Sequence, residues 1–279
     1  MYNDPFTIEE LQRAINMSTD NSQGPDEVSN MLLKAVPETA FPYILRVSNV
    51  VWKRIFFYNK WRVATIIPIP KPGKDHSNPR NFRPISLTSC LCKILEKMIN
   101  GRLVEYMENK IFNEIQCGFR RYKLTVDHLL RMVTFVRKGF ACYEMMYIFF
   151  NMEKAYDKTW RYGIMRDFHS TGLRGRLPLI INQILHNCMF QVKLQGCYLN
   201  TRIQESGVAR GLTISVSLFA IKINSFSKVI QKEIHVSMFV DSVQISYSHR
   251  DINELQRILQ RGVDSIAEWA RNNGFTFST

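Results

Sequence analysis

Residues 235–248 read HVSMFVDSVQISYS, and the interpretation of the whole chain depends on this stretch. Two β-prone runs, Val236–Val240 and Val243–Tyr247, flank the dipeptide Asp241-Ser242. Asp and Ser are turn-forming residues and apolar residues alternate on both sides, so the stretch predicts a tight hairpin. Rigid strands would present the Asp241 carboxylate outward, as a metal ligand requires. An isolated Asp-Ser pair is more often a simple turn, so other parts of the chain must decide between these interpretations.

The charge of the chain is concentrated in one segment. The 279 residues are 46% hydrophobic and carry a formal net charge of +13. Between Val51 and Thr125 there are 15 Lys and Arg residues against 5 Asp and Glu residues, so +10 of the +13 lies there. A solvated basic face is the simplest interpretation of an evenly spread charge, whereas this concentration favours a polyanionic partner such as nucleic acid or nucleotide phosphates.

The cysteines and the N-terminal residues indicate the cellular compartment of the protein. Six cysteines are scattered without a Cys-x-x-Cys pair or a histidine at zinc-ligand spacing, which argues against a zinc site or a redox motif. The first residues, MYNDPFTIEELQ, lack the apolar core of a signal peptide. No apolar run approaches the roughly 18 residues of a membrane span. We therefore expect an intracellular protein, cytoplasmic or nuclear, that is not secreted and has no membrane partner.

Hydrophobic periodicity predicts helices interspersed with strands. The predicted helices are Thr7–Met17, Met31–Ala35, Pro42–Lys60, Ser89–Met107, Val126–Lys138, Trp160–His169, Arg176–His186, Leu212–Ile230 and Asn253–Arg271. The predicted strands outside the hairpin are Val63–Ile69, Met145–Phe150, Phe190–Leu194 and Leu199–Gln204, of which Met145–Phe150 is expected to be buried. Because hairpins replace regular βαβ units, the fold class is α+β.

Six motifs occur in a fixed order along this framework. They are IPKPGKD (69–75), NFRPISL (81–87), FFNMEKAYD (149–157), GVARG (207–211), FVDS (239–242) and WARNNGF (269–275). Each motif alone is weak, but together they resemble the reverse transcriptase domain of non-LTR retrotransposons, most closely the jockey-type elements. The resemblance extends from Phe6 to Ser278.

This resemblance implies the fingers and palm of a right-hand polymerase. Residues 1–140 would be the N-terminal helices and the basic fingers, and residues 141–279 the palm with the Asp241 hairpin. The implied activity is RNA-directed DNA synthesis on an RNA or DNA template-primer with dNTPs. The family continues beyond Phe275 into a lysine-bearing loop and a thumb, so a thumb is expected to be absent from this sequence.

The resemblance also assigns roles to individual residues. Two divalent ions, Mg²⁺ or Mn²⁺, would stabilise the attacking and leaving oxygens, and carboxylates would hold them. Asp241 occupies a metal-ligand position. Tyr156 matches an aromatic gate against the ribose 2′-hydroxyl, although a core tyrosine is the plainer interpretation. The nucleotide- or template-binding positions are Lys71, Lys74, Arg83, Arg120, Tyr156 and Gly211.

The chain departs from the family pattern at the positions of the metal-binding aspartates. Asn151 and Ser242 stand where the family has the other two metal-binding aspartates, so only Asp241 remains. Ala209-Arg210 replaces a Pro-Gln pair, and residues 121–124 replace a small, glycine-containing stretch. A single carboxylate would compensate only a small part of the positive charge of two divalent cations. These changes predict a degenerate and truncated copy with impaired catalysis.

Two hypotheses therefore remain open. The first is a reverse transcriptase domain with an impaired metal site, and the second is a non-catalytic nucleic-acid-binding remnant. The number of carboxylates discriminates between them and favours the absence of present activity. An unrelated basic structural protein would require all six motifs to be coincidental, so we reject it.

Overall fold

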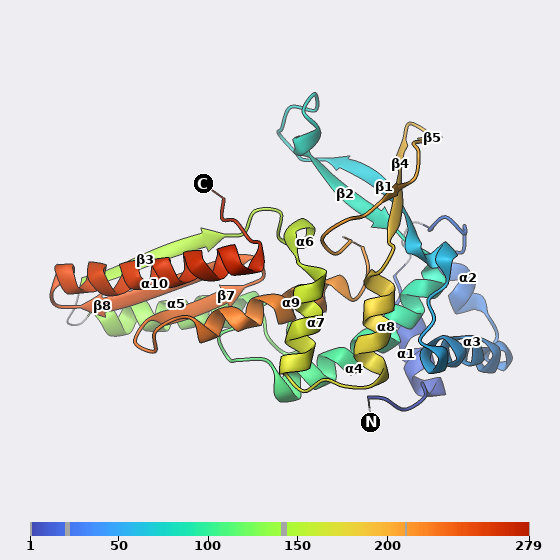
Figure 1. The fold of residues 1–279 in the computed structure, drawn as a ribbon, viewed down its shortest axis with the longest axis horizontal. Coiled ribbons are helices and arrows are strands. Elements are labelled where there is room, and N and C mark those ends of the chain that lie inside the picture. Colours follow the sequence, from blue (N-terminus) through green and yellow to red (C-terminus); the bar gives the residue numbers. More distant parts are fainter. Residues whose placement is uncertain (1, 20–22, 141–143, 210, 279) are drawn as a thin grey trace. The chain divides into compact units, whose positions relative to one another are not determined.

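The computed structural model describes residues 2–19, 23–140, 144–209 and 211–278 (Figure 1). The chain forms two compact units. Unit 1 comprises Met1–Tyr106 with Phe168–Ser215, and unit 2 comprises Met107–Asp167 with Val216–Thr279. The expected boundary between residues 140 and 141 borders residues 141–143, which lie outside the described residues.

Helices dominate the described chain. They are α1 (Ile8–Asn16), α2 (Asn30–Ala35), α3 (Phe41–Arg54), α4 (Cys90–Lys110), α5 (Thr125–Phe140), α6 (Ala155–Lys158), α7 (Arg161–Ser170), α8 (Arg176–Leu185), α9 (Ser215–Asn224) and α10 (Ile252–Asn273). None of the helices within the described residues is long and apolar enough to cross a bilayer.

Local sequence signals explain where these helices begin and end. The Thr7 hydroxyl accepts a hydrogen bond from the Glu10 backbone amide, and the Glu10 carboxylate accepts one from the Thr7 backbone amide, so the two residues form a capping box at the start of α1. Asp251 caps α10, and Gly274 ends it with a φ of 74°. Helix α3 ends before the predicted Lys60 because Ile55 adopts a left-handed conformation, with a φ of 52°.

The sheet of unit 1 has the order β2-β1-β4-β5, with β6 also paired to β4. Its strands are β1 (Val63–Pro70), β2 (Phe82–Leu87), β4 (Met189–Leu194), β5 (Cys197–Tyr198) and β6 (Arg202–Ile203). Strands β1 and β2 are antiparallel, whereas β1 and β4 are parallel. Strand β2 was not among the predicted strands, because Pro84 interrupts its pattern. Proline is tolerated there because β2 lies at the edge of the sheet.

The sheet of unit 2 has the order β3-β8-β7 and contains the predicted hairpin. Its strands are β3 (Glu144–Asn151), β7 (His235–Phe239) and β8 (Ser242–His249). The tight hairpin is confirmed, but its two-residue turn is Val240-Asp241 rather than Asp241-Ser242. Ser242 pairs with both Phe239 and Asn151, which draws it into β8. Val240 takes the positive φ, 58°, that such a turn needs.

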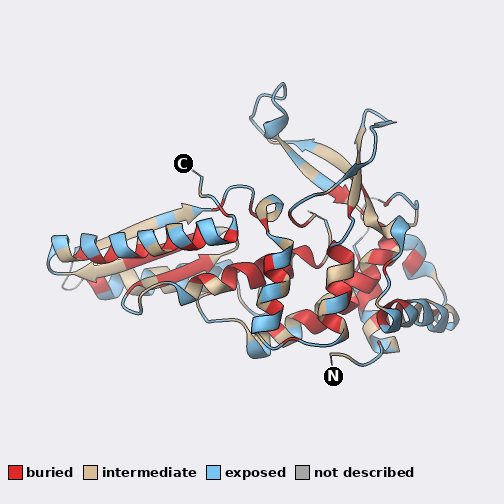
Figure 2. Cartoon of the chain, viewed as in Figure 1, coloured by how far each residue is buried: buried red, intermediate tan, exposed pale blue. Residues whose placement is uncertain are grey.

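The two faces of this sheet pack against different helices. One face packs with α9 and α10 in a hydrophobic core that includes Met238, Val243 and Ile245. Figure 2 shows α10 buried along one side and exposed along the other. The other face contacts α5. The expectation that β3 is fully buried is wrong, because Phe149 on this second face is 67% exposed.

Candidate active site

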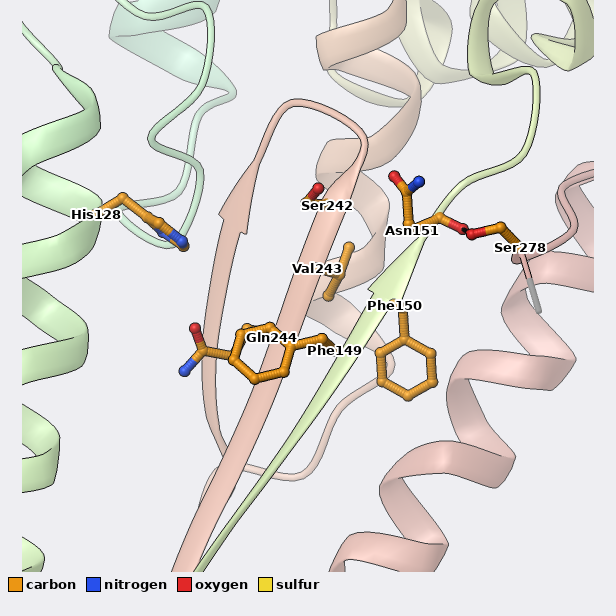
Figure 3. A pocket seen from close by; sticks show the side chains of 8 residues that line it. All are labelled: His128, Phe149, Phe150, Asn151, Ser242, Val243, Gln244 and Ser278. Carbon is orange, nitrogen blue, oxygen red and sulfur yellow. Dashed lines mark hydrogen bonds between the residues drawn. The ribbon is translucent and has the colours of Figure 1, made fainter. Parts of the chain in front are cut away.

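The hairpin brings together the three positions at which metal ligands were expected. Asn151 is the last residue of β3 and pairs with Ser242, the first residue of β8. The Met152 backbone amide donates a hydrogen bond to the Asp241 carbonyl oxygen at 3.0 Å. Asn151, Asp241 and Ser242 therefore lie at one end of the sheet, where Figure 3 shows the Asn151 and Ser242 side chains pointing the same way.

A loop that precedes α5 holds the hairpin in place. The Cys117 backbone amide donates to the Met238 carbonyl at 3.0 Å, and the Met238 amide donates to the Ile115 carbonyl at 3.1 Å. Gly118 follows directly, and a Cβ at this position would clash with the backbone nitrogen of Val240. A glycine is required where two backbones approach this closely. The loop therefore fixes the position of the turn that carries Asp241.

The donor set of this site does not match a pair of divalent cations. Asn151 offers an amide oxygen, Ser242 a hydroxyl and Asp241 the single carboxylate. Among the described residues, no three His, Cys, Asp or Glu side chains are grouped so that they could hold a metal. The Glu153 carboxylate is engaged by Lys158 at 2.9 Å, and this hydrogen bond, with one from Thr276, lowers its pKa. Mg²⁺ prefers several hard oxygens, including carboxylates, so the fit is poor.

A cavity of about 220 Å³ opens beside these positions. His128 on α5 borders it, and the Nδ1 atom of His128 lies 2.6 Å from the Ser237 hydroxyl. Burial lowers the pKa of His128, and Arg131 acts in the same direction. The cavity is lined by His128, Phe149, Phe150, Asn151, Ser242, Val243, Gln244 and Ser278 (Figure 3).

Two other expected site residues of unit 2 have partners inside the unit. The Arg120 guanidinium binds the Glu108 carboxylate at 2.7 Å and the Asn113 carbonyl at 2.8 Å. Arg120 therefore fastens its loop to α4. The Tyr156 ring on α6 packs 5.3 Å from that of Phe219, at the edge of the hydrophobic core.

The remaining expected residues lie in unit 1. The Lys71 backbone amide donates to the Asn81 carbonyl at 2.8 Å, which closes the β1–β2 connection. Lys74 lies in this exposed turn, and Arg83 is exposed on β2. Gly211 has a φ of 130°, and a Cβ there would clash with the Ser86 carbonyl oxygen on β2. The neighbouring Arg210 lies outside the described residues.

Sequence reasoning missed a buried carboxyl group beside this glycine. The Glu96 carboxylate on α4 accepts a hydrogen bond from the Thr213 backbone amide at 2.7 Å. Glu96 is completely buried, and burial raises its pKa to about 7. The signal in the sequence is a glutamate within the apolar run that surrounds it on α4. Glu96 thus ties α4 to the segment that follows Gly211.

Comparisons with known proteins agree with the motif order. The family model for reverse transcriptase (RNA-dependent DNA polymerase) matches residues 69–279. A probable RNA-directed DNA polymerase from transposon BS of Drosophila melanogaster is 28% identical over 96% of this chain. The RNA-directed DNA polymerase from mobile element jockey of Drosophila funebris is 26% identical over 96% of the chain. The chain spans 30% of the length of each of these two relatives.

Solved structures support the fold independently. A telomerase from Candida tropicalis, in complex with a fragment of telomeric RNA, superimposes with a TM-score of 0.57. Its sequence identity is 13%, and the match covers 86% of this chain and 44% of that one, so it shows the fold alone. The matched family model covers the β3–β8 junction and the hairpin that carries Asp241. The chain therefore belongs to the reverse transcriptase (RNA-dependent DNA polymerase) family and is a reverse transcriptase domain of the non-LTR mobile-element type.

Proposed function

We propose that this chain binds a template-primer as a fingers–palm domain, with 1–140 fingers-like and 141–279 palm-like, and that its nucleotidyl transfer is impaired. The observation that carries the proposal is the junction of β3 and β8, where Asn151 and Ser242 face one another across the pair. Both occupy positions that the family resemblance assigns to aspartates. Asp241 is then the only carboxylate at the three positions.

The chemistry of nucleotidyl transfer explains why this matters. The reaction needs two divalent ions close together to stabilise the attacking and leaving oxygens. One carboxylate supplies a single negative charge against the four positive charges of two dications. An amide oxygen or a hydroxyl can coordinate a cation but compensates none of its charge. We infer that Mg²⁺ or Mn²⁺ binds weakly here and that catalysis is lost with it.

Primer extension on an RNA template tests this proposal. We expect no extension by the chain itself in Mg²⁺ or Mn²⁺, and extension by the double variant Asn151→Asp, Ser242→Asp. Since metal stabilisation is worth several kcal/mol, the two rates should differ on the order of 1,000-fold. The matched control is Asn253→Asp, Asn272→Asp, which adds two carboxylates at exposed positions of α10 and should stay inactive.

Extension by the unaltered chain would overturn the proposed impairment. If the double variant binds template-primer but does not extend it, the lost carboxylates do not account for the lack of primer extension. That result would favour the alternative function, a non-catalytic nucleic-acid-binding remnant.

Template-primer binding should depend strongly on salt. The exposed β1–β2 connection carries Lys71 and Lys74, and Arg83 lies exposed on the adjoining strand. Each phosphate contact releases about one counterion, which gives a slope of roughly −0.7 to −0.9 in log affinity against log salt. Replacing all three side chains with Ala should therefore make the slope shallower by about 2, as measured by fluorescence anisotropy between 50 and 200 mM salt.

Three basic residues of unit 2 provide the control for this measurement. Ala substitutions at the exposed Lys228, Lys232 and Arg261 remove the same formal charge elsewhere. They should leave the slope close to that of the unaltered chain. An equal reduction by both triple variants would show that net charge, rather than the β1–β2 connection, governs binding.

A further inference from the structure

Helix α5 carries a row of exposed aliphatic side chains, which we call the α5 stripe. Its members are Val126, Leu129, Leu130 and Val133, which are between 38% and 65% exposed. Residues three and four positions apart are neighbours on a helix, so these four side chains form one continuous surface. Single exposed aliphatic residues are common on proteins, whereas a contiguous apolar patch marks an interaction site.

The opposite face of α5 packs on the sheet of unit 2. His128 points from α5 towards the strands (Figure 3), and its Nδ1 atom lies 2.6 Å from the Ser237 hydroxyl. Two turns further along, the Phe135 ring stacks on that of His235, with 4.6 Å between the centroids. At 100° per residue, the α5 stripe lies about half a turn around the helix from these contacts. A helix that is apolar on opposite faces is typical of one that is covered on both sides.

Cations lie at both ends of the α5 stripe. Arg121 and Lys123 precede α5, and Arg137 and Lys138 belong to its last turn. Residues 121–138 contain five Lys and Arg residues against one Asp and no Glu. The helix dipole favours cations in the last turn but disfavours them before the first turn, so it explains only one of these two pairs. A partner with acidic groups at both ends would complement both pairs.

The spacing and the charge together select the partner. An amphipathic helix docks through apolar residues at i, i+3, i+4 and i+7, and the α5 stripe has this spacing. From Val126 to Arg137 the surface is about 16 Å long, which corresponds to about three helical turns. We propose that the α5 stripe binds an amphipathic helix of another protein that carries acidic residues in its first and last turns.

Other occupants fit this surface less well. Two α5 stripes packed together, in either orientation, would bring like charges into contact, which disfavours a second copy of this chain. Nucleobases stack on aromatic rings, whereas the α5 stripe is entirely aliphatic. Helices that lie on membranes carry cations along their polar face, but here the polar face packs on the sheet and the cations gather at the ends.

This inference goes beyond the proposed function and does not depend on it. Docking of a helix on α5 requires no metal ion, template or polymerisation. Failure of primer extension therefore says nothing about the α5 stripe, and failure of helix docking says nothing about the lost carboxylates.

Fluorescence anisotropy with a labelled peptide of about 18 residues tests the proposal. The peptide carries leucines at i, i+3, i+4 and i+7 and glutamates in its first and last turns. We expect it to bind the unaltered chain, and to bind Leu129→Ala, Leu130→Ala at least about 10-fold more weakly, because half of the α5 stripe is removed. Leu179→Ala, Leu199→Ala is the matched control, since these leucines are 50% and 58% exposed in unit 1. It should leave the affinity unchanged.

A charge exchange tests the cations at the end of the stripe. Arg137→Glu, Lys138→Glu should weaken binding of the glutamate peptide about 10-fold and strengthen binding of the same peptide with lysines in place of its glutamates. Lys228→Glu, Lys232→Glu alters net charge equally at exposed positions of unit 2 and should change neither affinity appreciably. Because all of these side chains are exposed, the charge exchange remains decisive if the double Ala variant does not fold.

Three results would overturn the proposal. The first is no binding of the glutamate peptide by the unaltered chain, and the second is an equal loss of affinity in each variant and its control. The third is unchanged peptide binding by Leu129→Ala, Leu130→Ala together with weaker binding to a single-stranded oligonucleotide or to phosphatidylserine vesicles. The α5 stripe would then contact nucleic acid or a lipid surface instead of a helix.

Discussion

Replacing Asp167 with Asn is expected to lower the free energy of unfolding by about 3–5 kcal/mol. The Lys222 ammonium on α9 is 0% exposed and lies 3.0 Å from the Asp167 carboxylate on α7, whose side chain is 16% exposed. Removing the carboxylate leaves a buried cation without its counter-charge, and such a cation costs far more than the pair contributes. Chemical denaturation at pH 7 measures the loss.

The pH dependence of the stability of Asp167→Asn identifies the buried Lys222 charge as the cause of the loss. Burial lowers the pKa of Lys222, and Asp167 opposes this effect, so the variant should have a still lower pKa at Lys222. The folded state then binds fewer protons than the unfolded state, and stability rises as pH rises towards the ordinary lysine pKa of about 10.4. The deficit of Asp167→Asn should therefore shrink between neutral and alkaline pH.

Two further variants complete this experiment. Asp264→Asn makes the same change at an exposed position of α10 and should alter stability by no more than about 0.5 kcal/mol. Combining Asp167→Asn with Lys222→Met should recover most of the lost stability, because the buried charge is gone. A deficit below 1 kcal/mol in Asp167→Asn alone, or one independent of pH, would contradict the assignment of this pair.

The elements that sequence could predict are those with strong local signals. Alternating apolar residues placed the hairpin, and hydrophobic periodicity placed the first and last helices to within two residues at each end. The predicted turn was placed one residue too far along the chain, because Ser242 pairs with Asn151 and therefore belongs to the strand. Residues 235–248 alone could not indicate this pairing, because Asn151 lies outside them. Strand β2 was missed because Pro84 disfavours a strand everywhere except at a sheet edge.

The residues of the candidate site likewise fall into those that the sequence could predict and those that it could not. The ordered motifs were enough to expect Asn151, Asp241 and Ser242 in one place, and the structure brings them together. The engagement of Arg120 by Glu108 could not be expected, because it depends on how a loop folds back on α4. Likewise Lys222 and Asp167 are 55 residues apart, and no periodicity marks either as half of a buried pair. Such partners are specified by tertiary packing alone.

Replacing Glu96 with Gln is expected to remove a pH dependence from the stability of the chain. The pKa of this carboxyl group is raised from 4.5 to about 7 because it is buried, although the Thr213 amide favours the charged form. Its contribution to stability is thus fully present below pH 4.5 and is lost as pH rises through 7. The difference between the two pKa values corresponds to roughly 3 kcal/mol.

The comparison of the two chains isolates this group from other titrations. Below pH 4.5 both carry a neutral side chain that can accept from Thr213, so their free energies of unfolding should nearly coincide. At pH 8 the Glu96→Gln chain should be more stable by roughly 3 kcal/mol, because it has no charge to bury. Glu105→Gln, at an exposed position of α4, should follow the unaltered chain throughout.

A constant difference between pH 4.5 and 8 would show that Glu96 does not titrate in this range. Glu96→Leu separates the charge from the hydrogen bond, because leucine also carries no charge but leaves the Thr213 amide without its acceptor. We expect this variant to be less stable than Glu96→Gln by about 1–3 kcal/mol at every pH. The segment after Gly211 would then depend on the hydrogen bond from Thr213, and the charge on Glu96 would be a cost that rises with pH.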